Sequence, residues 1–267
     1  MSLFQMTLYW IYSIPNWLFG VLCTVAFVLF GVLGTYLSRD FVKRVHREDH
    51  SHNDIVGYFL AAITVFYGVT LGLVAIGTWN NYSAIQDKVD HEAQNVASLY
   101  RDVSSYPEPV RSELRQDLKD YVLEVIDHSW PQQRRGLVPS GSGVFIDHLQ
   151  EHMLQYSPQT SGQQVIYQES YHQFNELVES RRARLDSVTT SLPRSMWWMV
   201  ILGALVSITT TMFFDLRSFS MHVWMTALMS GLLGLMIFLI ATLDNPFRGK
   251  VSVSPVALER VYSQLIK

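Results

Sequence analysis

The stretch WNNYSAIQDKVDHEAQNVASLYR, residues 79–101, joins an apolar part of the chain to a charged one. Residues 55–79 carry no charged side chain, whereas charged and apolar side chains are mixed after Trp79. The apolar ones recur at steps of three and four residues, and no Gly or Pro interrupts them: Ile85, Val89, Ala93, Val96, Tyr100 and Val103. Because this is the spacing of one helix face, the sequence predicts a single helix that crosses a membrane and continues into water. From Trp79 to Arg101 it would extend about 30 Å.

Four long runs of the chain carry no charge: residues 17–37, 55–79, 196–214 and 221–243. Each is near or above the ~20 residues that a helix needs to cross a bilayer core. Hydrophobic residues make up 49% of the chain and charged residues only 16%. The sequence therefore predicts an all-α membrane protein with four transmembrane helices. Residues 1–14 are apolar but too short to cross, which favours a segment that lies at the membrane interface.

About a hundred residues between the second and third predicted spans have the pattern of a helical bundle. After the helix that begins the stretch, Val110 opens a second helix, 131–143 is rich in Pro, Gly and Ser as loops are, 144–156 is a third helix and about 163–190 a fourth. Val165 belongs to the apolar side of that fourth helix. The predicted organisation is 1–79 for the interfacial segment and spans one and two, 80–195 for an extramembrane helical domain, 196–243 for spans three and four, and 244–267 for a tail on the same side as the domain.

The sequence determines the orientation of the chain in the membrane only in part. Four crossings place both chain ends and the 80–195 domain on one face. The short loop at 38–54 carries four Arg and Lys residues, and the positive-inside rule puts such a loop in the cytoplasm and the domain outside it. Basic residues near helix ends on the domain side, among them Arg194 and Arg248, argue for the opposite orientation.

The second predicted span has small residues along one stripe: Gly57, Ala61, Thr64, Gly68, Gly72 and Ala75. Such a stripe usually lets two transmembrane helices approach closely. The alternative is that it lines a pore when subunits assemble, with Thr64, Tyr67 and Thr70 as polar contacts along the path. No Asp, Glu, Lys or Arg stands inside any span, which disfavours a pump or a proton-coupled transporter.

Motifs for catalysis or cofactor binding are missing from the sequence. The cluster HREDHSHND (46–54) could hold a metal ion, but a solvated loop in which Asn53 or Asp54 caps the second span explains it as well. No P-loop, nucleophile elbow, HExxH or dinucleotide motif occurs, and no basic run suggests nucleic-acid binding. We expect neither an enzyme nor a bound cofactor or metal.

Three parts of the sequence resemble the bestrophin-like domain family of bacterial membrane proteins. One is HND with Gly57 at the start of the second span, and another is LDNPFRGKVSVSP at 243–255. The third is the opening stretch together with Pro107, in which these residues fit the family pattern: Trp79, Tyr82, Ala84, Val89, Glu92, Ala93, Leu99, Tyr100 and Arg101.

The resemblance to true bestrophins is more distant. They have four spans, a pore lined by the second helix, a large cytoplasmic loop and an Asn-Pro-Phe-Gly motif after the fourth span. In this chain Arg248 interrupts that motif, and Val251, Ser252 and Val253 stand where animal bestrophins have an acidic calcium-binding run. The resemblance therefore implies an inner-membrane channel, with anion conduction but without calcium gating.

The second and fourth spans emerge on the same face, so the residues that follow them are expected to lie at one membrane surface. We expect a collar there, made by Trp79, Tyr82, Asp244, Asn245, Pro246, Phe247, Arg248 and Gly249. Asp244 could pair with Arg248, or it could simply cap the helix end. Glu92, Tyr100 and Arg101 form the family-like motif of the domain.

Two functions are consistent with these observations. The first is an oligomeric ion channel that conducts inorganic ions across the lipid bilayer, with the second helix lining the pore and the helical domain forming a vestibule or gate. The second is a membrane-anchored helical sensor or protein-interaction module without a pore.

Overall fold

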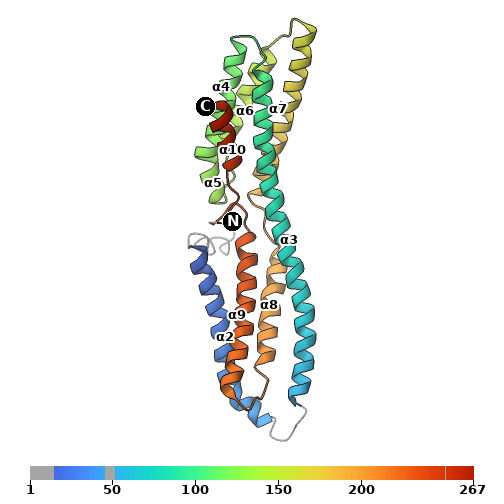
Figure 1. Ribbon diagram of the computed structural model, residues 1–267, viewed down its shortest axis with the longest axis vertical. Helices are drawn as coiled ribbons and strands as arrows, with labels where there is room; N and C mark the ends of the chain where they lie inside the picture. The colour runs from blue at the N-terminus through green and yellow to red at the C-terminus, as the bar shows by residue number, and fades with distance from the viewer. Residues whose placement is uncertain (1–14, 46–51, 250) are drawn as a thin grey trace. The chain divides into compact units, whose positions relative to one another are not determined.

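The computed structural model describes residues 15–45, 52–249 and 251–267, and every regular element in these ranges is a helix (Figure 1). The all-α prediction is therefore confirmed. The described residues fall into two compact units. The membrane unit contains 15–45, 52–80, 191–244, 249 and 251, and the helical unit contains 81–190, 245–248 and 252–267. The interfacial prediction for 1–14 and most of the histidine cluster at 46–54 lie outside the described residues.

The helices of the membrane unit follow the four uncharged runs. They are α2 (Asn16–Val45), the first part of α3 (His52–Val103), α8 (Arg194–Thr211) and α9 (Phe219–Leu243). Among the described helices, α2, α3 and α9 are long and apolar enough to cross a membrane. α8 has 18 residues and begins with Arg194, so the count of four crossings stays a prediction.

α3 passes through Trp79 without a break. Its 52 residues are helical from His52 to Val103, so the prediction of one continuous helix over residues 79–101 is confirmed. The helix ends four residues before Pro107. This agrees with the sequence prediction, because the residue that precedes a proline disfavours the helical conformation.

Small residues bring α2 and α9 close together within the membrane unit. A Cβ atom added to Gly234 would lie 3.0 Å from the Thr24 Cα, and one added to Gly31 would overlap the Ser230 hydroxyl. Phe19 and Phe238 meet edge to face with ring centroids 5.6 Å apart. This is the close backbone approach that small residues permit between membrane helices.

The helical unit is built from α3 after residue 80 and from seven further elements. They are α4 (Val110–Glu124), the π-helical turn η2 (Val125–Ser129), α5 (Trp130–Arg134), α6 (Ser142–Gln155), α7 (Ser161–Ser187), α10 (Val256–Val261) and η3 (Tyr262–Ile266). The apolar stripe of α3 is buried in its core, with Val89, Val96, Leu99 and Val103 at 0% exposure. Leu114, Leu118, Val122 and Val125 of the next helical run are buried against it.

Two expectations for the helical unit were wrong. Residues 131–134 are helical rather than loop, because Pro131 lies in the first turn of α5, where its missing N–H leaves no bond unmade. Val165 is 64% exposed and does not face the core. The sequence analysis made no prediction for the secondary structure of the tail, where α10 and η3 bury Leu258 and Ile266 in the core of this unit.

Candidate functional site

Three glycines of the small-residue stripe of α3 have no packing partner among the described residues, whereas Ala75 at its end packs against the core of the membrane unit. A Cβ atom added to Gly57, Gly68 or Gly72 would meet nothing within 4 Å. Ala61 is exposed, and Thr64 and Ala75 are half-buried. The stripe therefore differs from the small residues of α2 and α9, which are covered by the neighbouring helix.

A different face of α3 attaches it to the membrane unit. Tyr67 is 8% exposed, its hydroxyl donates a hydrogen bond to the Val200 carbonyl at 2.7 Å, and its ring covers Gly203 of α8. Leu71 lies on the same face and is buried in the same cluster. The expectation that Tyr67 offers a polar contact along a pore was wrong, because its hydroxyl is used within the chain.

The two threonines of the predicted path satisfy their hydroxyls within α3. Thr64 Oγ1 donates to the Leu60 carbonyl at 2.7 Å, and Thr70 Oγ1 donates to the Phe66 carbonyl at 2.9 Å. A hydroxyl bonded to its own helix keeps lone pairs that can accept from water, at little cost in an apolar environment. The stripe is therefore small, uncharged and only weakly polar.

The predicted collar residues fall in both units and are described unit by unit. In the membrane unit, Asp244 is 6% exposed; its Oδ1 accepts from the Leu192 N–H at 2.5 Å and its Oδ2 from the Trp197 indole at 3.0 Å. Asp244 thus ties the end of α9 to the start of α8. Trp79 is 56% exposed. Gly249 has a φ of 81°, a conformation that glycine adopts without strain.

In the helical unit, the Asn-Pro-Phe segment forms a tight turn against the core. Phe247 is 2% exposed, and its ring meets Trp130 edge to face at 5.7 Å. The Arg248 N–H donates to the Asn245 carbonyl at 2.9 Å, and the Pro246 carbonyl accepts from the Val253 N–H at 2.7 Å. Tyr82 packs, partly buried, against the same core. The collar itself stays a prediction.

Glu92, the acidic residue of the family-like motif, lies in a buried polar network. Its carboxylate accepts from Arg184 Nε at 2.5 Å and Nη2 at 3.0 Å, and from the Tyr121 hydroxyl at 2.5 Å. Glu92, Arg184 and Tyr121 are all 0% exposed. The Arg184 guanidinium also lies 5.9 Å from the Trp130 ring centroid. The network joins α3, α4 and α7 in the middle of the helical unit.

The charges of this network stabilise one another. Burial alone would lower the pKa of Arg184, but the adjoining Glu92 carboxylate raises that pKa above its ordinary value. Burial, and then the charge of Glu92, raise the pKa of the Tyr121 hydroxyl well above its usual range. The hydroxyl therefore stays protonated and donates its hydrogen bond. Sequence reasoning missed both partners. The signal was Glu92 itself, which stands between Val89 and Val96 on an apolar stripe and so requires a buried cation.

The other two residues of the motif lie nearer the surface. Tyr100 is partly buried, and the Arg115 guanidinium lies 5.0 Å from its ring centroid. Arg101 is exposed in the last turn of α3, where a cation complements the helix dipole. The contacts of Glu92, Tyr100 and Arg101 therefore explain the motif by its role in stabilising the helical bundle.

Comparisons with known proteins agree with these features. The family model of the bestrophin-like domain matches residues 25–258. A bacterial bestrophin homologue from Klebsiella pneumoniae superposes with a TM-score of 0.69 at 12% identity, covering 92% of this chain and 96% of that one. A structure described as a membrane protein variant gives a TM-score of 0.70 at 12% identity, covering 91% and 95%. No curated protein matches the chain in sequence.

At 12% identity the solved structures establish the shared fold alone. The family model carries the assignment, because it covers most of α2, all of α3, α8 and α9, the Asn-Pro-Phe turn and the start of α10. The chain is an integral membrane protein, as its apolar helices require. It belongs to the bestrophin-like domain family, whose members are channel-type membrane proteins.

Proposed function

We propose that the chain assembles into an oligomeric ion channel in which α3 lines the pore. The observation that carries the proposal is the open stripe of α3. Three of its glycines have no neighbour among the described residues, although α3 is attached to α8 through Tyr67 on another face. Residues at one-residue steps lie about 100° apart around a helix, so Tyr67 and Gly68 point in different directions. A second copy or a water-filled path would complete the stripe.

The composition of the stripe supports a pore more than a coupled transporter. Residues 55–79 hold no Asp, Glu, His, Lys or Arg, which disfavours a proton relay through them. They hold neither the acidic ring of many cation filters nor the basic ring of many anion pores. Anions are our proposed permeant ions because the resemblance to bestrophins implies them. The helical unit would serve as vestibule or gate. The proposed pore surface comprises Gly57, Ala61, Thr64, Gly68, Gly72 and Ala75.

Four membrane crossings belong to this proposal, with α8 as the fourth. Eighteen residues extend about 27 Å, close to the thickness of a bilayer core. Trp198 near its start is 66% exposed, as expected of an aromatic side chain at the membrane interface. We place the protein in a bacterial inner membrane and propose that the helical unit lies outside the cytoplasm.

Planar bilayer recording with purified full-length protein tests the proposal, with Gly68→Leu as the variant. Gly77→Leu is the matched control, because Gly77 is also open, lies on the same helix and stands nine residues (about 2.5 turns) away on the opposite face. We expect ion conductance from the native chain, a loss of most of it in Gly68→Leu and little change in Gly77→Leu. Silent bilayers from assembled oligomer would refute the channel and favour the interaction module. Equal effects of the two variants on conductance would contradict the proposal that α3 lines the pore.

A further inference from the structure

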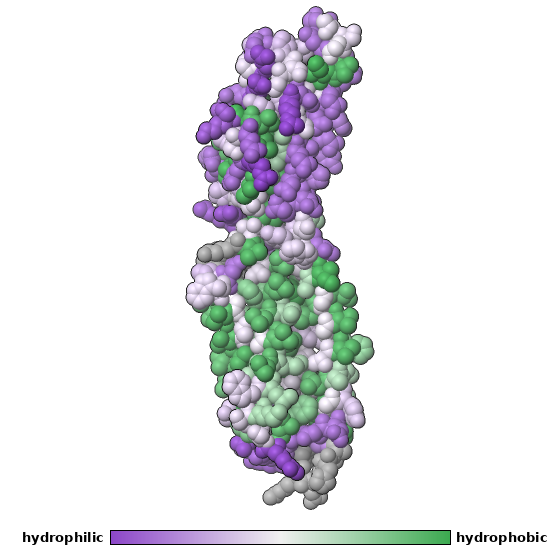
Figure 2. Space-filling model, viewed as in Figure 1, coloured by the Kyte–Doolittle hydropathy of each residue, from purple (hydrophilic) through white to green (hydrophobic). Residues whose placement is uncertain are grey.

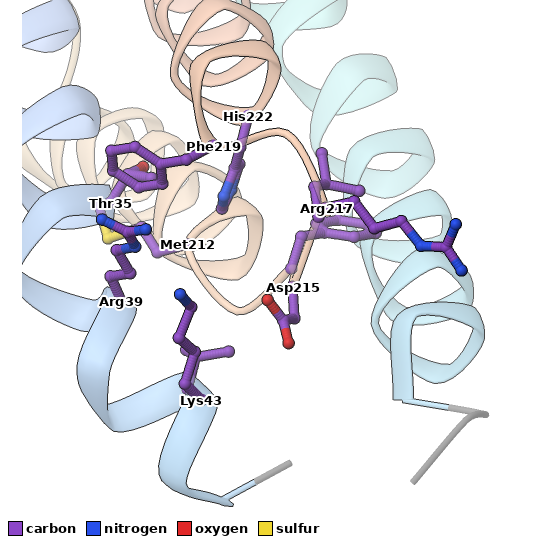
Figure 3. Close-up of a pocket in the computed structure, with 11 residues that line it drawn as sticks. Thr35, Arg39, Lys43, Met212, Asp215, Arg217, Phe219 and His222 are labelled. Carbon is purple, nitrogen blue, oxygen red and sulfur yellow. The ribbon is translucent and has the colours of Figure 1, made fainter. Parts of the chain in front are cut away.

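A polar pocket lies at the end of the membrane unit where α2 finishes and α9 begins (Figure 3). α2 contributes Thr35, Arg39 and Lys43, the turn after α8 contributes Asp215 and Arg217, and α9 contributes His222. The pocket uses none of the residues of the proposed pore surface.

Two cations on α2 face this pocket. Figure 3 shows Arg39 and Lys43 directed toward it, whereas the guanidinium of Arg217 points away. Both are exposed, and neither takes part in an ion pair or hydrogen bond with another described residue. Arg39 is held in place by stacking, with its guanidinium carbon 4.3 Å from the Phe219 ring centroid. A stacked guanidinium keeps its in-plane N–H groups available, and their geometry suits two oxygens of a phosphate.

The walls of the pocket are fixed by hydrogen bonds. His222 is 6% exposed, and its Nε2 donates to the Thr211 carbonyl at 2.9 Å. Asn53 of α3, which sequence reasoning offered as a helix cap, instead exchanges two bonds with Asp215. Its Nδ2 donates to the Asp215 carbonyl at 2.7 Å, and its Oδ1 accepts from the Asp215 N–H at 2.9 Å. The turn that closes the pocket is thereby anchored to α3.

The pocket stands at the height where the apolar surface ends. The uncharged run of α2 stops at Leu37, two residues before Arg39, and α9 starts beside the pocket. Leu37, Phe41 and Met221 next to it are 83%, 61% and 60% exposed. Figure 2 shows hydrophobic residues giving way to hydrophilic ones at this end of the membrane unit. In a bilayer that covers this apolar surface, lipid phosphates would lie at this depth, and basic residues near such a boundary attract anionic headgroups.

We propose that this pocket binds an anionic phosphate group, with Arg39 and Lys43 as its ligands. The exposed apolar residues beside it would contact the acyl chains if the phosphate belongs to a lipid. Asp215 is the one acidic side chain that lines the pocket among the described residues, and it opposes the anion. Its removal should therefore strengthen binding, an effect opposite to that of removing either cation.

Native mass spectrometry of the full-length protein in detergent tests the proposal with two lipids, phosphatidylglycerol and phosphatidylcholine. We expect tighter binding of the anionic lipid, a weakening of about fivefold for Arg39→Gln or Lys43→Gln, and a strengthening for Asp215→Asn. Arg44→Gln is the matched control, because Arg44 is exposed on the same helix end but does not line the pocket. Its lipid affinity should stay within about twofold of the native value.

Thermal unfolding with added inorganic phosphate distinguishes the source of the group. If inorganic phosphate raises the unfolding temperature and Arg39→Gln abolishes this effect, the ligand is a soluble phosphate. If inorganic phosphate has no effect but the protein prefers the anionic lipid, the ligand is a lipid headgroup. Equal binding of both lipids with no effect of phosphate would overturn the proposal. So would an Arg44→Gln variant that weakens the anionic lipid as much as Arg39→Gln does. Neither readout depends on conduction.

Discussion

Glu92 carries a fully buried charge in the helical unit, and its carboxylate joins three helices through hydrogen bonds to Arg184 and Tyr121. In Glu92→Gln, Arg184 would keep its charge at 0% exposure without a counter-ion. Removing one partner of a buried ion pair costs about 3–5 kcal/mol. We expect a clear fall in the unfolding temperature of the full-length protein in detergent, measured by circular dichroism.

The matched control for this change is Glu108→Gln. Glu108 pairs with Arg111 at 2.6 Å, but both side chains are largely exposed, and such pairs contribute little. Its unfolding temperature should match the native value. The double variant Glu92→Met, Arg184→Met should recover part of the loss, because apolar side chains can replace a buried pair. If Glu92→Gln unfolds like Glu108→Gln, the network does not stabilise the bundle.

His152 gives the helical unit a dependence on pH. Its Nδ1 donates to Asp117 Oδ2 at 2.6 Å, and this hydrogen bond is the main reason that the pKa of His152 is raised above 6.5, with further contributions from Glu113 and Glu151. A raised pKa means that the contribution to stability is complete below about pH 6.5 and is lost as the pH rises through the folded-state value.

The native protein should therefore lose more stability between about pH 5.5 and pH 8.5 than the His152→Gln variant does. The measurement is the unfolding temperature of both proteins at the two pH values. Because about a third of the His152 side chain is exposed, solvent screens the pair and the expected difference is small. Identical pH profiles would show that the pair makes no contribution.

Among the elements, the α2–α9 pair permits a paired test of close packing. A Cβ atom at Gly234 would lie 3.0 Å from the Thr24 backbone, whereas one at Gly231 would make an ordinary contact of 3.5 Å with Val28. Gly234→Ala should therefore destabilise the protein by about 1–3 kcal/mol, as overpacking does. Gly231→Ala, one turn earlier, should be neutral or stabilising, since alanine is the better helix former. Equal unfolding temperatures for the two variants would contradict the packing.

The same elements show what a sequence can and cannot reveal. Uncharged runs and periodic apolar residues predict α2, α3, α8 and α9, because each pattern is local and its spacing is that of a helix. The partners of Glu92 depend on which helices meet, and Arg184 is 92 residues away. The burial of Phe247 has the same origin, since nothing near it in the chain signals that Trp130 covers it.

For the whole molecule, the decisive question is whether water reaches the open stripe of α3 once the protein is assembled. The chain has one cysteine, Cys23, whose thiol lies 3.4 Å from the Gly234 carbonyl. Replacing it by Ser keeps a donor and leaves a background without thiols. Cys can then be introduced at Gly68 on the stripe or at Gly77 on the opposite face. At both positions a Cβ atom would meet no neighbour among the described residues.

Only a thiolate in contact with water reacts readily with a charged, water-soluble thiol reagent. In a channel lined by α3, the Gly68→Cys protein should be labelled in proteoliposomes, and its conductance should fall as the label accumulates. The Gly77→Cys protein would face lipid or protein and should stay unlabelled, with unchanged conductance. Labelling at Gly77 but not at Gly68 would place water on the other face of α3. If neither site reacts in assembled protein, water does not reach the stripe, and the permeation path must run along another helix.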